Sequence, residues 1–247
     1  MTAPTVELVD EIVAALATVS DPELDQPITD LGFVRSITLD DHGVIVRLRL
    51  PTAFCAPNFA YLMASDAQDA LRMVENLGTV HVLLDDHHDS QKINAGLAAN
   101  AGYRGTFGDE ASDSLADLRR TFLRKAHAAA MERCVAAHLK ESDLRLDEIF
   151  RLTLRDLAAG KEKTALLRRR VDVGLSICPA SRVVVDDEGH PLSRVEVPMR
   201  LRFARSVRIS MEGNAHFCRG LLATRYGDSD SADTPQVIDI RTTGRPQ

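Results

Sequence analysis

A cysteine, Cys55, stands between two segments of different periodicity. The residues just before it, RLRL, alternate as in a strand, and from Pro57 to Leu77 apolar side chains recur at helical spacing. A cysteine directly ahead of a helix lies near the positive end of the helix dipole and near unpaired backbone N–H groups. Both favour a thiolate, which is a metal ligand or a nucleophile. The alternative is a small apolar residue buried under the loop.

Two further segments carry polar groups that suit chemistry. Asp21 and Glu23 lie in the motif DPEL, and DDHHDS places three carboxylates and two imidazoles between Asp85 and Asp89. Histidine together with carboxylate suits ferrous iron, manganese or zinc. The metal ligands predicted from these segments are Cys55, His88, His87, Asp86 and Asp89. A solvated polar turn is the alternative interpretation of DDHHDS.

The two adjacent histidines are not expected to act alike. On an extended loop their side chains point in opposite directions, so only one of them should face Cys55. We favour His88, because Asp86 and Ser90 would then lie on its side of the loop.

The elements around these motifs predict a compact α/β unit. Apolar spacing indicates a helix over 6–19, a hairpin of two strands over 31–39 and 44–50 with the turn DDHG, a helix over 57–77, a strand over 79–84 and a short helix over 90–100. The order helix, strand, strand, helix, strand, helix predicts an α/β N-terminal domain with a small mixed sheet.

The topology of this sheet should bring the polar motifs together. Two strands joined by a helix favour a right-handed parallel crossover, so the strands ending at Leu50 and Leu84 should end at the same edge. The first strand of the hairpin runs the other way, and it therefore starts at that edge, just after DPEL. Strand ends are where open α/β sheets place their sites. We therefore expect the DPEL motif, Cys55 and the 85–89 loop to converge.

The remainder of the chain predicts a second region. A Gly- and Ser-rich segment, 102–114, separates a domain of residues 1–105 from a region of residues 110–226. In that region we expect helices over 114–139, 146–159 and 161–170, then a hairpin over 181–197 and a strand over 200–210, which makes it α+β. The segment 214–226 is ambiguous between strand and helix, and 227–247 is predicted to be a disordered tail.

The other cysteines and histidines are better explained by packing. His127, Met131, Cys134 and His138 share one helix face, on which Cys134 and His138 could share a metal, but Met131 and nearby alanines favour a packing face. We interpret Cys178 as part of a Cys-Pro bend and Cys218 as a buried strand cysteine.

Composition excludes several classes of function. The chain has 247 residues and a net charge of -6, whereas a protein that binds nucleic acid needs a basic face. No apolar run approaches the roughly 20 residues of a membrane span. The N-terminus lacks signal-peptide features and the four cysteines lack a disulfide spacing, so a cytoplasmic protein is expected. The sequence contains no Gly-rich phosphate loop, GxSxG or HExxH, which argues against common catalytic classes.

At family level, VSDPELDQPITDLGFVRSI followed by LPTAFCAP resembles the SufT/PaaD-type iron–sulfur cluster assembly domain over about residues 5–100. The resemblance implies a small, non-enzymatic α/β domain that assists cluster assembly or delivery to client proteins. It implies that Cys55 is the functional cysteine and that Asp21 and Glu23 form the acidic signature. The sequence departs from the family in placing Ala56 between the cysteine and Pro57, and in its histidine pair.

The longer form, with DHHDS and a helical extension, resembles accessory proteins of binuclear-iron hydrocarbon monooxygenases. That resemblance implies a di-iron client enzyme rather than an iron–sulfur client.

The sequence therefore predicts a non-catalytic assembly factor that delivers iron, or a transient iron–sulfur cluster, to a client metalloenzyme through Cys55. The region 110–226 would supply client recognition or dimerisation. Two alternatives remain open: a thiol-dependent hydrolase with Cys55 as nucleophile and His87 or His88 as base, and a metal-free chaperone of an oxygenase subunit.

Overall fold

The computed structural model describes residues 3–111, 115–142, 145–230 and 235–241. It divides into two compact units, of which the first combines Met1–Leu115 with Asn214–Gln247 and the second is Ala116–Gly213. The C-terminal segment therefore belongs with the N-terminal domain, whereas the sequence suggested that residues up to 226 form a separate region and that the rest is a tail. The described residues contain no helix that is long and apolar enough to cross a membrane.

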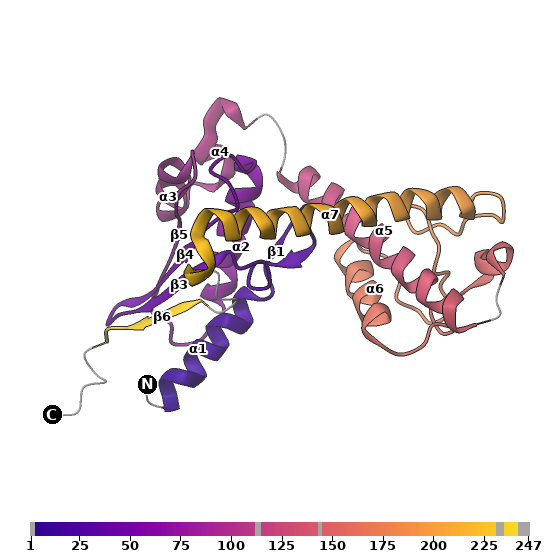
Figure 1. Cartoon of the computed structure of the whole chain (residues 1–247), viewed down its shortest axis with the longest axis horizontal. Coiled ribbons are helices and arrows are strands. Elements are labelled where there is room, and N and C mark those ends of the chain that lie inside the picture. Colours follow the sequence, from indigo (N-terminus) through magenta and orange to yellow (C-terminus); the bar gives the residue numbers. More distant parts are fainter. Residues whose placement is uncertain (1–2, 112–114, 143–144, 231–234, 242–247) are drawn as a thin grey trace. The chain divides into compact units, whose positions relative to one another are not determined.

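The first unit is built on a four-stranded mixed sheet with the strand order β5-β4-β3-β6 (Figure 1). Its principal elements are α1 (Ala3–Leu16), β3 (Val34–Leu39), β4 (Gly43–Leu48), α2 (Pro57–Arg72), β5 (Thr79–Leu84), α3 (Ser90–Ala98) and β6 (Gln236–Asp239). β3 and β4 form the predicted antiparallel hairpin, and β4 and β5 form the predicted parallel pair, with Val46 opposite Val82. The predicted α/β fold with a small mixed sheet is confirmed.

The hairpin turn and the start of β5 lie in close backbone contact. Asp40 closes the turn, because its Oδ1 accepts hydrogen bonds from the backbone N–H groups of His42 and Gly43, each at 2.8 Å. The N–H of Thr79 donates to the carbonyl of His42 at 2.8 Å. A Cβ atom on Gly43 would lie 2.0 Å from the carbonyl oxygen of Thr79. Only glycine allows β4 and β5 to start this close together.

Helix α2 covers the sheet with an apolar face. The apolar residues of α2 recur at helical spacing, so one stripe of side chains is buried, including Ala60, Met63, Ala64, Ala67 and Leu71. α1 buries Ile12 and Leu16 in the same core.

Short elements occupy segments in which the sequence indicated only loops. A two-residue ladder joins β1 (Ser20–Asp21) to β2 (Gln26–Pro27) and encloses the DPEL motif. The predicted linker contains α4 (Gly102–Phe107) and the 3-10 helix η1 (Gly108–Glu110), and residues 112–114 lie outside the described part. Tyr103 and Phe107 pack against Tyr61, with ring centroids 5.4 Å and 6.0 Å from it. The linker is thus partly built into the first unit.

The strand predicted over 200–210 is wrong, because these residues belong to helix α7 (Val197–Asp230). The buried side chains Ala204, Met211, Ala215 and Leu222 recur at seven- and four-residue steps, which is a helical stripe. Over shorter windows of RLRFARSVRIS, Leu201 with Phe203 and Val207 with Ile209 recur at two-residue steps, which imitates a strand pattern.

The prediction of a disordered tail is corrected for residues 236–239, which form β6 and pair in parallel with β3. Val237 lies opposite Ile37 in this register. Residues 231–234 and 242–247 of the predicted tail lie outside the described part.

The second unit is helical and has its own core. It contains α5 (Leu115–Glu141), the 3-10 helix η2 (Leu146–Arg151), α6 (Lys161–Asp172) and the first half of α7. Among the described residues of 181–197, the predicted hairpin is reduced to isolated bridges, and the helix predicted to reach 159 is only η2. Burial raises the pKa of Cys134 to about 12 and lowers that of His127 to about 4, as expected for groups on a packing face.

We predict that Gly43→Ala destabilises the protein by about 2 kcal/mol or more, because the new methyl group would collide with the backbone of Thr79. Gly220→Ala is the matched control: it lies in α7 with open space around it, so the change should stabilise the protein by up to about 1 kcal/mol. Urea unfolding followed by circular dichroism measures both. Equal stabilities of the two variants would contradict the close approach of β4 and β5.

Candidate functional site

The loops that follow β4 and β5 meet at one edge of the sheet, as predicted. His87 is buried, and its Nε2 lies 2.8 Å from the carbonyl oxygen of Cys55. The backbone N–H of Asp89 donates to Nδ1 of His87 at 3.1 Å, so we assign the imidazole proton to Nε2, which donates to Cys55. The N–H of His88 donates to the carbonyl of Ala53 at 2.9 Å. Two hydrogen bonds thus hold the Cys55 loop against the 85–89 loop.

The Cys55 thiol is partly buried at the start of α2. Its Sγ lies 3.6 Å from Oγ1 of Thr52, and its side chain packs against the core of the unit. Pro57 occupies the start of the helix, where a missing N–H costs nothing. The neighbouring Phe54 is 81% exposed. The loop therefore offers a partly accessible thiol beside an exposed aromatic ring.

His87 rather than His88 contacts the backbone of Cys55, whereas the predicted role of His88 as the metal ligand beside Cys55 stays a prediction. His88 is exposed and its ring lies 5.9 Å from that of Phe54, whereas the ring of His87 contacts residue 55. The prediction assumed an extended loop, but Asp86 has a φ of 53°. This left-handed residue interrupts the alternation of side chains.

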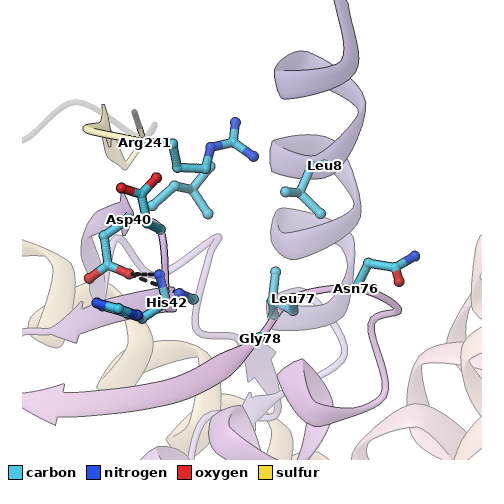
Figure 2. Close-up of a pocket in the computed structure, with 10 residues that line it drawn as sticks. Leu8, Asp40, His42, Asn76, Leu77, Gly78 and Arg241 are labelled. Atoms are coloured by element: carbon cyan, nitrogen blue, oxygen red, sulfur yellow. Dashed lines mark hydrogen bonds between the residues drawn. The ribbon is translucent and has the colours of Figure 1, made fainter. Parts of the chain in front are cut away.

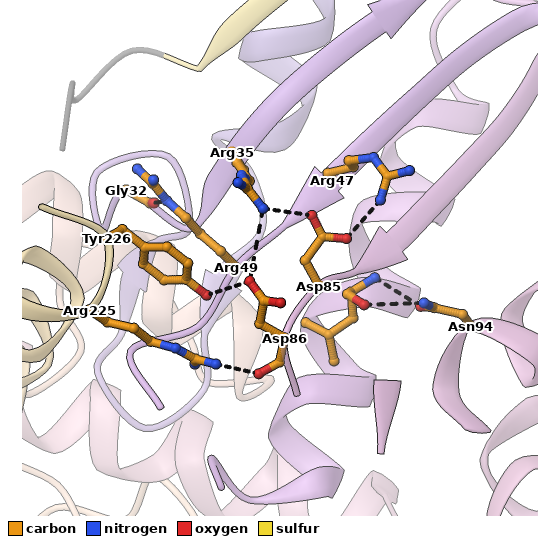
Figure 3. A network of polar contacts seen from close by, with 10 residues as sticks. Gly32, Arg35, Arg47, Arg49, Asp85, Asp86, Asn94, Arg225 and Tyr226 are labelled. Carbon is orange, nitrogen blue, oxygen red and sulfur yellow. Dashed lines mark hydrogen bonds and ion pairs between the residues drawn. The ribbon is translucent and has the colours of Figure 1, made fainter. Parts of the chain in front are cut away.

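The carboxylates of Asp85 and Asp86 face arginines (Figure 3). Asp85 pairs with Arg47 at 2.8 Å and with Arg35 at 3.3 Å, which ties the segment after β5 to β4 and β3. Asp86 lies 3.9 Å from Arg35 and accepts from the hydroxyl of Tyr226 at 3.4 Å. These partly exposed pairs contribute modestly to stability, but they orient both carboxylates. The sequence analysis missed Arg35 and Arg47, which strand alternation could have placed on one face.

Asp21 organises the DPEL motif. Its Oδ1 accepts hydrogen bonds from the N–H groups of Glu23 and Leu24 at 2.8 and 2.9 Å. The side chain is buried, and burial raises its pKa to about 6, against the lowering effect of the two hydrogen bonds. Asp21 therefore shapes the turn. Glu23 has a different contact, because its Oε1 accepts a hydrogen bond from Nδ2 of Asn214 at 3.2 Å.

The second half of α7 lies over the same edge, which the sequence analysis did not anticipate. Nη1 of Arg225 donates to the carbonyl of Leu50 at 3.0 Å. Its Nη2 donates to the carbonyl of Asp86 at 2.5 Å (Figure 3). Tyr226 lies against the guanidinium groups of Arg49 and Arg35, at 5.1 and 6.0 Å from its ring. The spacing of Ala215 and Leu222 was the available signal for this packing face.

The described residues contain no group of three or more His, Cys, Asp or Glu side chains arranged to hold a metal ion. In the structure His87 is used to join two loops and Asp86 contacts Arg35 and Tyr226. A thiol partly open to solvent is nevertheless a donor that suits iron. The composite metal site of Cys55 with His87, His88, Asp86 and Asp89 stays a prediction.

A polar cavity of about 420 Å³ lies at the opposite edge of the sheet (Figure 2). It is lined by the β3–β4 turn with Asp40 and His42, by Leu77 and Gly78, and by Arg241. Arg241 pairs with Asp239 at 2.7 Å. The cavity contains none of the predicted site residues.

Two comparisons with known proteins each found a match. A family model described as "Iron-sulfur cluster assembly protein" matches residues 9–84. The uncharacterized protein MJ1129 of Methanocaldococcus jannaschii is 31% identical over 86 residues, which is 34% of this chain and 88% of the relative. No solved structure matches. The chain thus belongs, through this domain, to the iron–sulfur cluster assembly protein family, which defines an assembly-related role.

The matched segment contains some of the predicted site residues but not all of them. It includes Asp21, Glu23 and Cys55 and ends at Leu84, before the 85–89 loop.

We predict a pH-dependent effect of Asp21→Asn. The folded protein holds the Asp21 proton more tightly than the unfolded chain, so this group's contribution is fully present below about pH 4 and is lost as the pH rises through about 6. Asparagine keeps the oxygen that accepts both backbone hydrogen bonds and removes the buried charge. Urea unfolding near pH 5 and near pH 8 measures the free energy of unfolding of both proteins. Between the two pH values, the difference in this free energy should shift by about 1 kcal/mol in favour of the variant, because only wild type loses the Asp21 contribution. A difference that does not change with pH would contradict the raised pKa.

Proposed function

We propose that this protein is a non-catalytic assembly factor that carries iron, or a transient iron–sulfur cluster, on Cys55 and passes it to a client iron protein. The observation that carries the proposal is a partly exposed thiol in the family-matched segment, on a loop fixed by the hydrogen bond from His87 to the Cys55 carbonyl. Cys55 is the only cysteine within residues 9–84 of the sequence.

The contacts of the histidines favour this role over the thiol-dependent hydrolase. A nucleophilic cysteine needs a base within hydrogen-bonding reach of its sulfur. Both ring nitrogens of His87 are engaged by backbone groups of Cys55 and Asp89. His88 is exposed beside Phe54. Neither contact joins an imidazole to the Cys55 thiol.

The chemistry of the edge suits cargo that must be released. A thiolate is a soft donor that binds iron and iron–sulfur clusters, and a site with few donors from the carrier leaves coordination positions for the recipient. Exposed Phe54 provides an apolar contact beside the thiol for the client. We propose that the client is an iron–sulfur protein or a di-iron monooxygenase; a metal-free chaperone of an oxygenase subunit remains the alternative.

We predict that ferrous iron, titrated anaerobically into the full-length protein, binds at least about tenfold more weakly to Cys55→Ser than to wild type, a loss of about 1.4 kcal/mol. His87→Ala should also weaken binding, because the Cys55 loop loses its anchor. His88→Ala tests the composite metal site, and Cys178→Ser, at an exposed thiol in the other unit, is the matched control.

The same titration separates the alternatives. Iron that binds equally to wild type and Cys55→Ser would contradict carriage on Cys55. A wild-type protein that binds neither iron nor a cluster, yet still binds its client, would support the metal-free chaperone.

A further inference from the structure

The first half of α7 exposes large apolar side chains on the surface of the second unit. Of the six exposed large apolar residues described in this unit, four lie within residues 195–209, namely Val195, Met199, Phe203 and Ile209. The same helix already buries a separate stripe of Val197, Ala204 and Met211. A helix that exposes apolar side chains outside its buried stripe offers a second contact face.

A groove of about 330 Å³ lies in the same unit and is formed by side chains of α5 and α7. Val135, Ala136 and Leu139 line it from α5, and Pro198 and Leu201 line it from α7. We call it the α5–α7 groove. An apolar groove between two helices accepts the apolar side chains of a third helix.

The charged residues of the α5–α7 groove favour an acidic occupant. Arg202 and Arg205 line the groove and are exposed, and neither has a carboxylate partner among the described residues. Glu132 also lines the groove, but it is paired with Arg208. The two arginines therefore offer charge-assisted hydrogen bonds to carboxylates supplied by an occupant.

Phe203 adds an ordered aromatic ring beside these arginines. Arg202 and Phe203 both lie one turn after Met199, so the charge and the exposed apolar side chains share a face of α7. The guanidinium of Arg200 lies 5.9 Å from the centre of the Phe203 ring, and Arg200 is itself anchored by an ion pair with Asp187. A ring that is already ordered loses little freedom when it binds, which suits an apolar anchor.

Two other occupants fit this face less well. In a symmetric dimer through the groove, Arg202 and Arg205 of one copy would approach the same arginines of the other, and like charges in an interface oppose association. An anionic membrane would attract the arginines, but a flat lipid surface does not fill a groove. The net charge of -6 on the chain also opposes its approach to such a membrane.

We propose that the α5–α7 groove docks an amphipathic helix of the client, whose apolar stripe enters the groove and whose Asp or Glu side chains pair with Arg202 and Arg205. The inference rests on the proposed function, because the docked helix belongs to the client that receives the iron. The groove lies outside residues 9–84, which the family model matches. Docking is therefore a property that this chain has beyond the family domain.

A pair of designed peptides tests the chemistry of the occupant. The probe is a fluorescently labelled helix of about 18 residues, with Leu at positions i, i+3, i+4 and i+7 and Glu along both edges of that stripe; the matched probe has Lys in place of every Glu. Fluorescence anisotropy with the full-length protein should show saturable binding of the Glu peptide. The Lys peptide should bind at least about tenfold more weakly.

Charge reversal tests the two arginines. Arg202→Glu combined with Arg205→Glu should weaken binding of the Glu peptide by at least about tenfold. Arg155→Glu combined with Arg168→Glu is the matched control, because it makes the same change in charge at two exposed positions elsewhere in the second unit. The control should bind the Glu peptide as wild type does.

Two further variants test the apolar contacts. Ala136→Leu keeps a good helix former in α5 but fills the groove, so it should abolish binding of the Glu peptide while circular dichroism stays native. Phe203→Ser changes an exposed ring and should weaken binding. If Ala136→Leu disturbs the packing of α5, Phe203→Ser decides this part of the test.

The outcomes separate the inference from the proposed function. If the Glu peptide does not bind, or binds the Arg202→Glu, Arg205→Glu protein as tightly as wild type, the docking surface is wrong. Sedimentation with vesicles of equal parts phosphatidylcholine and phosphatidylglycerol, or self-association in analytical ultracentrifugation that Phe203→Ser abolishes, would assign the face to a membrane or a second copy and overturn the inference. Ferrous iron should bind equally to wild type and the Arg202→Glu, Arg205→Glu protein, and the Glu peptide should bind equally to wild type and Cys55→Ser. Failure of either proposal therefore leaves the other measurable.

Discussion

The parallel pairing of β4 with β5 is the constraint on which the candidate site depends. Because the two strands run in the same direction, the loops that follow Leu48 and Leu84 emerge at the same edge of the sheet. At the opposite end, the strands can start side by side only because Gly43 lacks a side chain facing Thr79. One backbone contact thus sets the register that places Cys55 and His87, which are 32 residues apart in sequence, within hydrogen-bonding reach.

Polar contacts then fix the loops that the strands bring together. Nε2 of His87 donates a hydrogen bond to the Cys55 carbonyl. Asp85, which follows β5, forms ion pairs with Arg35 on β3 and Arg47 on β4. Each exposed ion pair is weak, and their common effect is orientation. A thiol on a loop that is held at its backbone can exchange cargo without losing its place. These contacts support the proposal that Cys55 carries iron and releases it to a client.

The local elements of the first unit could be predicted from the sequence, whereas the contacts that complete it could not. Periodicity and turn chemistry are local properties, so the hairpin closed by Asp40, helix α2 after Pro57 and the crossover to β5 followed from them. The addition of β6 to β3 depends on pairing between residues 36–39 and 236–239, which no local pattern encodes. For the same reason Cys218 could be interpreted only as a buried cysteine, although its helical stripe was present in the sequence. His88 was preferred to His87 because a left-handed Asp86 cannot be inferred from residue types alone.

Iron X-ray absorption of the anaerobically loaded, full-length protein tests the central claim most directly, because it identifies the atoms bound to the metal. The account predicts sulfur among the nearest neighbours of iron in the wild-type protein. In Cys55→Ser the sulfur neighbour contributed by Cys55 should be absent, while the circular dichroism spectrum is unchanged. Iron surrounded only by oxygen and nitrogen in the wild-type protein would contradict it.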